Sequence, residues 1–307
     1  MSAPILVGYQ PLREDNAPVD FAAACAKATG APLVVGAVAH GSEVESIGRA
    51  ALEEEAAEAD AKGLEHLRAR LEGDGVNAEI RVLHGRSAPH VLHDTAEEIG
   101  AGLLVVGSTN RGHAGRVAVG SSAQRLMHGA PCPIAVVPHE WTAGGGVSTV
   151  GVAFADSPEG HQALHAAAGV ARRLGASLRV LAAAKPHGFG QTHGRGDALT
   201  PAVTYEEVGS ALRASAERAI EAIADEAGMA IETDASVGDP AEFLIGASKH
   251  VDLLVCGSRG YGPRRAVLLG GVTGKVTAEA HCPVIVLARG VEGSLEPLFG
   301  ESAGATA

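Results

Sequence analysis

Aromatic residues are scarce in this chain: its 307 residues include 5 Phe, 3 Tyr and 1 Trp, which is 3%. Hydrophobic residues nevertheless make up 46% of the sequence, so Ala, Val and Leu must fill the core. Small aliphatic side chains favour close layers of helices on a sheet over an aromatic-rich β-sandwich. The shortage of aromatics therefore indicates an α/β fold.

Basic residues are also in short supply. The chain has 24 Lys and Arg against 36 Asp and Glu, a formal net charge of −12 at pH 7. Non-specific binding to nucleic acid requires a basic face that neutralises phosphates. We therefore expect no nucleic-acid partner.

Cysteines and long apolar runs are few as well. Four cysteines in a chain of this length do not make a disulfide framework. Cys132 and Cys282 each precede a proline, and we interpret both as small buried hydrophobic residues rather than redox groups. No apolar run reaches the ~18 residues that a membrane span needs, and the N-terminus does not resemble a signal peptide. These absences predict a cytoplasmic protein without a membrane partner.

An internal repeat organises the chain. Residues 253–283 repeat the pattern of residues 103–133, in which an apolar run leads into a glycine-rich loop and then a helix-like segment. Four pairs of residues are separated by the same 150 positions: Gly107 and Gly257, Gly112 and Gly262, Gly120 and Gly270, and Cys132 and Cys282. A constant separation over such a length indicates two copies of one domain.

Each copy predicts alternating strands and helices. We predict strands at 4–9, 33–38, 79–83, 103–106 and 134–137, and again at 149–154, 178–183, 231–237, 253–256 and 284–287. Most of these segments are short apolar runs, whereas 79–83 alternates between apolar and polar residues. Helical patterns occupy 21–29, 44–71, 88–99 and 121–128, and then 158–174, 205–227, 241–250 and a segment opening near 271. This alternation implies a five-stranded parallel sheet flanked by helices in each copy.

The domain limits follow from composition. We predict one domain at 1–140 and a second at 147–290, joined by a glycine-rich linker within 139–148. Residues 291–307 offer little to bury, so we expect a disordered tail.

The glycine loops are the candidate sites. Each follows a strand and precedes a helix, so free backbone N–H groups and the positive end of the helix dipole face the crevice beyond the sheet. Phosphates suit such a place, although the alternative is a tight turn without a ligand. The sequence GGVTGK at Gly270–Lys275 is not a Walker A motif, because its spacing is wrong and it lies inside the helical segment.

The loop spacing is similar to that of the universal stress protein family, whose nucleotide loop reads G-x-x-G, nine residues, then G-S/T. Copy two has Gly257 and Gly260, nine residues, then Gly270 and Gly271. Copy one has the same spacing, reading Gly107, Asn110, Gly120 and Ser121. The resemblance covers both copies almost end to end. It implies the tandem bacterial type, with two Rossmann-like (adenine nucleotide alpha hydrolase-like) domains.

The resemblance further implies a stress-response protein that binds ATP, with or without Mg²⁺, or a related adenine nucleotide. The residues implied to bind it lie near the ends of the second and fourth strands and just after the first strand: Val38, Gly107, Ser108, Asn110, Arg111, Gly112, Gly120, Ser121, Ser122, Asp156, Ala183, Gly257, Ser258, Gly260, Tyr261, Gly262, Gly270, Gly271 and Val272. Members of the family also pair through the fifth strand, which points to Ile134–Val137 and Val284–Leu287, either within one chain or in a homodimer.

The chain departs from the family pattern in both copies. The family pattern has an acidic residue just after the first strand. In copy one this position is occupied by Gln10, and in copy two by Ala155, with Asp156 one residue later. Asn110 replaces the second loop glycine, and Gly271 replaces the usual hydroxyl residue. We therefore expect the two sites to bind nucleotide with unequal affinity.

The leading hypothesis is a nucleotide-binding regulatory protein that is not an enzyme. The chain lacks a persuasive catalytic set, so ATP hydrolysis should be slow or absent. The alternative from another class is an interaction scaffold that has lost nucleotide binding in one or both domains, as Gln10 and Ala155 would suggest. A true ATPase or nucleotidyl transferase is the third reading, and the missing carboxylates oppose it.

Three further features of the sequence each allow two interpretations. His90, His93 and Asp94 suggest a metal site or, more simply, a polar helix surface, and we predict no metal. The loop arginines either reach phosphates or stay solvated: Arg111, Arg116, Arg259, Arg264 and Arg265. The long segment 185–203 is either a lid on copy two or a tolerated surface insertion.

Overall fold

The computed structural model describes most of both copies. The described residues are 2–10, 15–39, 50–85, 87–108, 125–127, 130–139, 141, 142, 144, 146–185, 204–223, 228–257, 270–287, 295 and 298.

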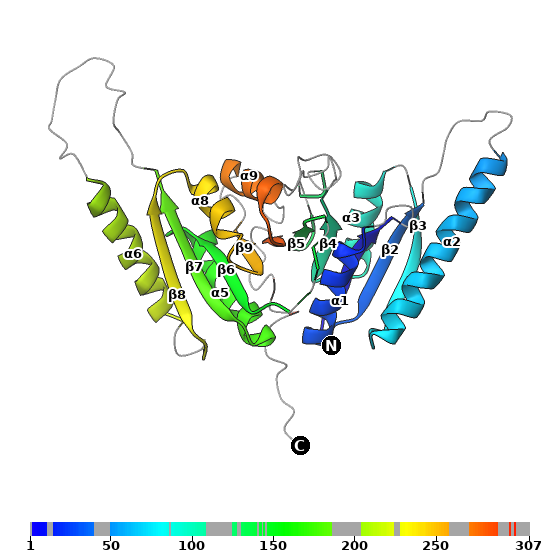
Figure 1. Cartoon of the computed structure of the whole chain (residues 1–307), viewed down its shortest axis with the longest axis horizontal. Coiled ribbons are helices and arrows are strands. Elements are labelled where there is room, and N and C mark those ends of the chain that lie inside the picture. The colour runs from blue at the N-terminus through cyan, green and yellow to red at the C-terminus, as the bar shows by residue number, and fades with distance from the viewer. Residues whose placement is uncertain are drawn as a thin grey trace, which may run out of the picture.

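Strands and helices alternate along both copies, as the sequence predicts. Copy one contains β1 (Ile5–Tyr9), α1 (Ala17–Thr29), β2 (Leu33–Ala39), α2 (Ala50–Gly73), β3 (Ala78–His84), α3 (Ala88–Glu98), β4 (Leu103–Gly107) and β5 (Ile134–Val137). Copy two contains β6 (Thr149–Phe154), α5 (Pro158–Leu174), β7 (Ser177–Ala184), α6 (Tyr205–Glu221), β8 (Ile231–Val237), α8 (Pro240–Ala247), β9 (Leu253–Cys256), α9 (Gly271–Glu279) and β10 (Val284–Val286). The two copies lie side by side, with α2 and α6 at the outer flanks (Figure 1).

One sheet of ten strands runs through both copies, in the order β3-β2-β1-β4-β5-β10-β9-β6-β7-β8. Every pairing inside a copy is parallel. The copies join where β10 pairs antiparallel with β5, with Val284 opposite Val136 and Val286 opposite Ile134. The predicted α/β architecture with a mostly parallel sheet is confirmed.

The sheet is buried on both faces, as continuous apolar strands predict. Along β9, Leu253 and Val255 belong to one apolar cluster, together with α5 and α6. Leu254 and Cys256 belong to the other cluster, which includes side chains of α8 and α9. Helices therefore cover both faces of copy two, and the described helices that follow the strand ends all start at the same edge of the sheet.

Contacts beyond the strands also join the copies. Arg173, in the last turn of α5, donates from Nε to the Ala28 carbonyl at 3.2 Å and from Nη2 to the Thr29 carbonyl at 3.1 Å. These carbonyls end α1, where backbone acceptors lack partners within the helix. Trp141 of the linker meets the Phe21 ring edge-on, with 5.5 Å between centroids.

The expectation that residues 291–307 have little to bury does not hold for two leucines. Leu295 and Leu298 are 1% and 2% exposed and belong to the core cluster that includes α1. Leu298 lies so close to Gly102 that a Cβ there would sit 2.8 Å from its Cδ1 atom.

The predicted limits of helices α1, α6 and α8 were wrong. Helix α1 begins at Ala17, four residues earlier than expected, because Pro18 is well accommodated in a first turn. Helix α6 ends at Glu221 rather than Ala227, and α8 spans Pro240–Ala247 rather than 241–250. After α8, the Ser248 hydroxyl donates to the Ile245 carbonyl at 2.7 Å and accepts the His281 N–H at 2.9 Å. These side-chain hydrogen bonds of Ser248 compete with the backbone hydrogen bonds that would continue the helix.

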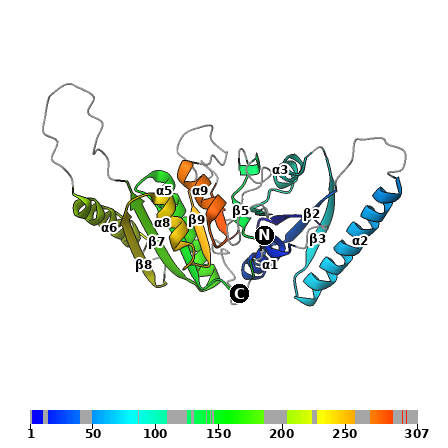
Figure 2. The same ribbon diagram turned by 45° about the horizontal axis from the view of Figure 1, so that its top comes forward.

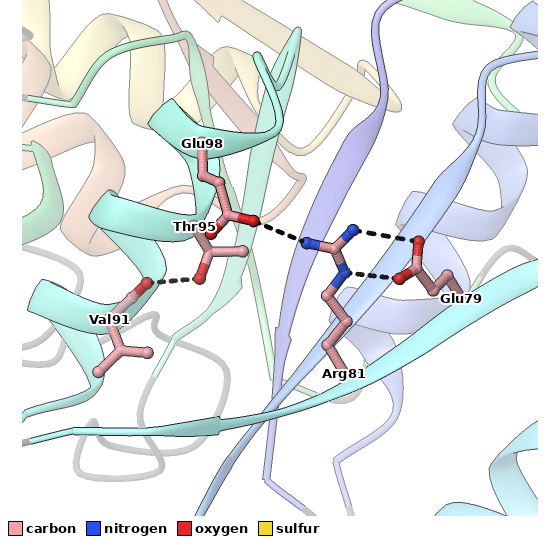
Figure 3. Close-up of polar contacts among 5 residues, drawn as sticks. All are labelled: Glu79, Arg81, Val91, Thr95 and Glu98. Atoms are coloured by element: carbon pink, nitrogen blue, oxygen red, sulfur yellow. Dashed lines mark hydrogen bonds and ion pairs between the residues drawn. The ribbon is translucent and has the colours of Figure 1, made fainter.

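Helix α3 is tied to β3 by an arginine between two carboxylates (Figure 3). Arg81 Nε donates to Glu79 Oε1 at 2.6 Å, and Nη1 donates to Glu98 Oε1 at 3.5 Å. The hydrogen bond from Arg81 lowers the pKa of Glu79. In element order α3 is the counterpart of α8, and this contact links the last turn of α3 to β3.

No helix within the described ranges is long and apolar enough to cross a membrane.

A single carboxylate fastens the start of copy two. Asp252 precedes β9, and its Oδ2 accepts the Ser148 N–H at 2.9 Å, the Ser148 hydroxyl at 2.6 Å and the Thr149 N–H at 2.9 Å. Partial burial opposes ionisation, but the hydrogen bonds from Ser148 and Thr149 outweigh it and lower the pKa of Asp252.

Asp252→Asn should lower the free energy of unfolding at pH 7 by about 1–2 kcal/mol, because it removes the charge that these donors stabilise. The folded pKa is depressed, so the stabilisation is present above pH ~4 and is lost as pH falls through the folded pKa. Urea unfolding at pH 7 and at pH 2.5 measures both effects, with exposed Asp74→Asn as the control. Equal losses for Asp252→Asn at the two pH values would contradict this account.

Candidate functional site

A cleft of about 650 Å³ opens at the carboxyl edge of the sheet in copy two. Its volume is within the range of small-molecule sites, about 300–1,000 Å³. The described residues that line it come from the ends of β7 and β9 and from the first turns of α8 and α9: Ala184, Lys185, Asp239, Pro240, Ala241, Gly257, Gly270, Gly271, Val272, Thr273 and Lys275.

The topology explains why a cleft forms here. Strand β6 lies between β7 and β9, and the chain moves outward from β6 to β7 and β8 before returning to β9 on the other side. In open parallel sheets, ligands bind beyond the strand ends at such a reversal of strand order. Helices α8 and α9 pack against each other and lie together beside β9 (Figure 2).

The start of α9 presents backbone donors to this cleft. Gly270 is the N-cap residue, and no side chain caps the helix. The first intrahelical hydrogen bond runs from Gly274 N–H to the Gly270 carbonyl at 2.8 Å. The N–H groups of Gly271, Val272 and Thr273 therefore lie before the helical ladder and carry the positive end of the helix dipole.

Thr273 fixes this helix start to the end of β9. Its hydroxyl donates to the Gly257 carbonyl at 3.3 Å. One turn later, the buried Thr277 hydroxyl donates to the Thr273 carbonyl at 2.9 Å. The first bond joins the start of α9 to the end of β9, and the second lies within the helix.

The other side of the cleft carries an ion pair. Lys185 follows β7 directly, and its Nζ lies 2.7 Å from Asp239 Oδ2. Asp239 is the N-cap of α8, and its Oδ1 accepts the N–H groups of Ala241 at 2.9 Å and Glu242 at 3.2 Å. The Lys185 ammonium, followed by these backbone donors, lowers the pKa of Asp239 to about 2.

A second lysine reaches the cleft from α9. Lys275 lies in the lining, and its Nζ is 3.8 Å from Glu242 Oε1 on α8. Both lysines remain substantially solvated, with side chains that are 64% exposed for Lys185 and 43% for Lys275. The cleft thus combines two cations, one carboxylate and an uncapped helix start.

The surroundings of two glycines of the predicted motif differ, so packing requires a glycine at only one of them. A Cβ at Gly257 would lie 2.9 Å from the Glu159 carbonyl oxygen, so the glycine lets the first turn of α5 approach β9. A Cβ at Gly271 would meet nothing within 4 Å. Gly257 is therefore required by packing, and Gly271 leaves open space at the helix start.

Copy one shows the same packing at its first loop glycine. A Cβ at Gly107 would lie 2.9 Å from Pro18 Cγ and 3.6 Å from Asp15 Oδ2. The sequence suggested that copy one lacks an acid at this place because Gln10 follows β1. The structure brings the carboxylate of Asp15 there instead, where Oδ1 accepts the Ala17 N–H at 3.1 Å.

Two further predicted residues of copy one are already used by the fold. Ser108 is buried, and its hydroxyl accepts the His139 N–H at 2.9 Å, which ties the chain after β5 to the end of β4. Val38 is 6% exposed and packs in the core, so only its backbone remains for a ligand.

Asp156, a predicted nucleotide contact, has its carboxylate paired with two side chains. Its Oδ1 is 3.0 Å from His161 Nε2, and its Oδ2 accepts the Ser215 hydroxyl of α6 at 2.7 Å. His161 and then Ser215 lower the pKa of this carboxyl. Helices α5 and α6 pack on the sheet face opposite α8, and Asp156 is not among the described residues that line the cleft.

Of the other predicted residues, the structure gathers Gly257, Gly270, Gly271 and Val272 in the cleft, and Ala183 precedes the lining residue Ala184. The remaining predicted residues lie outside the described ranges: Asn110, Arg111, Gly112, Gly120, Ser121, Ser122, Ser258, Gly260, Tyr261 and Gly262. So do all five loop arginines and the segment 186–203.

Sequence reasoning missed the charged residues of the cleft, namely Lys185, Asp239 and Lys275. A signal for one of them was present: Asp239 precedes a proline and stands three residues before Glu242, which is the pattern of a helix N-cap. The lysines carry no comparable local signal, because only the sheet topology brings them to one cleft.

The remaining alternatives concern cysteine and histidine. Cys132 and Cys282 are buried, as predicted, and burial raises the pKa of the Cys132 thiol to about 12. His90 and His93 lie 3.6 and 3.4 Å from the Asp94 carboxylate. In the part of the chain that the structure describes, no group of His, Cys, Asp and Glu is arranged to hold a metal ion.

Known proteins match both copies. The family model of the Universal stress protein family matches residues 1–138 and 146–288. A universal stress protein of Mycobacterium tuberculosis is 26% identical over 247 residues, which cover 76% of this chain and 80% of that protein.

Solved structures share the fold of the whole chain. A universal stress protein from Archaeoglobus fulgidus aligns with a TM-score of 0.68 at 19% identity, over 94% of this chain and 100% of that one. A putative universal stress protein from Pseudomonas aeruginosa gives 0.63 at 17% identity, over 97% and 96%.

Substitution by alanine should affect stability at Gly257 but not at Gly271. Gly257→Ala should lower the free energy of unfolding by about 1–3 kcal/mol, because its methyl group meets backbone that cannot easily move. Gly271→Ala should cause no loss, since its methyl group enters open space at a helical position. Urea unfolding without nucleotide measures both, and a stable Gly257→Ala would show that α5 does not require the glycine.

Proposed function

Because this chain belongs to the universal stress protein family, we propose that it is an adenine-nucleotide-binding regulatory protein of the stress response, with ATP bound in the cleft of copy two. The observation that carries the proposal is the uncapped start of α9 in that cleft. Backbone N–H groups at a helix N-terminus are natural phosphate donors.

The rest of the cleft suits the remainder of a nucleotide. Val272 is 39% exposed within the lining and offers apolar contact to a base or ribose. Pro240, Ala241 and Ala184 add further apolar surface on the side of β7 and α8. A site with a few convergent polar groups in an apolar setting is typical of small-molecule pockets.

Binding rather than hydrolysis is the proposed activity. Asp239 is the carboxylate of the described lining, and its pKa is lowered to about 2 by Lys185 and the first N–H groups of α8. A general base works best when its pKa lies near the working pH. Asp239 is therefore a poor group for activating water against a phosphate.

We also propose that the two domains pair within one chain rather than in a homodimer through the fifth strands. The antiparallel pairing of β5 with β10 supports this, because it occupies the strand edges that such a homodimer would use. The Arg173 bonds to the end of α1 support the same arrangement.

Calorimetric titration of the nucleotide-stripped protein with ATP tests the function. Gly271→Glu should lower the affinity of the copy-two site for ATP by at least about 30-fold, because a carboxylate at the helix start repels phosphate. The same carboxylate is favourable to the helix dipole, so the free energy of unfolding should not fall.

Gly246→Glu is the matched control, because a Cβ at this exposed position of α8 also meets nothing within 4 Å. It adds the same charge outside the cleft and should leave ATP binding unchanged. Loss of binding in Gly271→Glu alone supports the proposal. If the wild-type protein releases no heat with ATP and carries no nucleotide, the proposal fails and the interaction scaffold becomes the better account.

A further inference from the structure

Each lysine of the copy-two cleft lies near a carboxylate. Lys185 is paired with Asp239 at 2.7 Å, and Lys275 lies 3.8 Å from Glu242. Both lysines line the cavity that contains the α9 start, one from each side. In a chain with a net charge of −12, this convergence of cations suits a ligand with several negative charges.

We propose that Lys185 and Lys275 make this cleft selective for a chain of two or more phosphates, so that ATP binds more tightly than AMP. The inference rests on the proposed function and deepens it. The α9 N–H groups serve a phosphate that both nucleotides share. The lysines serve the additional phosphates that AMP lacks.

The existing ion pairs can yield to such a ligand. Solvated ion pairs contribute little to stability, and both lysines keep flexible, exposed side chains. Lysine is a mobile point charge that binds phosphate well. When Lys185 leaves Asp239, the Asp239 carboxylate still accepts two N–H groups at the start of α8.

Glu242 competes with phosphate for Lys275, and this gives a test in two directions. Lys185→Gln and Lys275→Gln should each weaken ATP binding by about 5- to 10-fold and AMP binding by less than about twofold. Glu242→Gln should strengthen ATP binding by about two- to threefold, because it frees Lys275. If the ion pairs only stabilised the structure of the cleft, all three variants would bind ATP more weakly than the wild-type protein.

The binding event of copy two is identified in each case as the one that Gly271→Glu removes. Lys249 is an exposed lysine two residues beyond the end of α8, and Lys249→Gln is the charge control that should leave the binding of both nucleotides unchanged. Equal weakening of ATP and AMP by the lysine variants, or no weakening, would overturn the inference. So would equal affinity of the wild-type cleft for ATP and AMP.

Inorganic tripolyphosphate separates this inference from the proposed function. If tripolyphosphate binds with the same dependence on Lys185 and Lys275 while ATP does not bind, the lysine selectivity stands and nucleotide binding fails. If ATP binds with the selectivity above, both stand. If neither anion binds the wild-type protein, both fail.

Discussion

Burial of the sheet on both faces is the constraint on which the rest of the structure depends. Parallel strands covered on both sides need helical crossovers, so within each copy the chain leaves every strand at the same edge. Copy two obeys this with α5 and α6 on one face and α8 and α9 on the other. The ends of β7 and β9 then flank β6, and the cleft forms where the helices of one face begin.

This constraint gives the motif glycines two separate meanings. Gly257 lies where the first turn of α5 presses on the end of β9, so the residue would be needed even if nothing bound. Gly271 stands in open space at the start of α9, so packing against the described residues does not require a glycine there. A glycine spacing read from sequence therefore mixes the packing of the fold with the shape of the site, and only the structure separates them.

Sequence patterns predicted the architecture well because burial on both faces leaves a local trace. Runs such as Leu253–Cys256 are continuous and apolar, and their alternation with helical segments determines the sheet type. Helix ends were harder to predict, as at Ala17, where Pro18 fits the first turn, and at Glu221. In the charged part of the site, the sequence carries a signal only for Asp239, as a helix N-cap, and the topology alone brings Lys185 and Lys275 to the same cleft. The contacts that Asp156 makes with His161 and Ser215 were also not predicted from the sequence.

Amide hydrogen exchange with and without ATP tests the central claim most directly, because the N–H groups of Gly271, Val272 and Thr273 precede the hydrogen-bonded ladder of α9. The account predicts that ATP slows exchange at these amides and around Lys185, while the start of α5 near Asp156 does not change. Protection confined to the α5 side, or no protection at the start of α9 at saturating ATP, would contradict it.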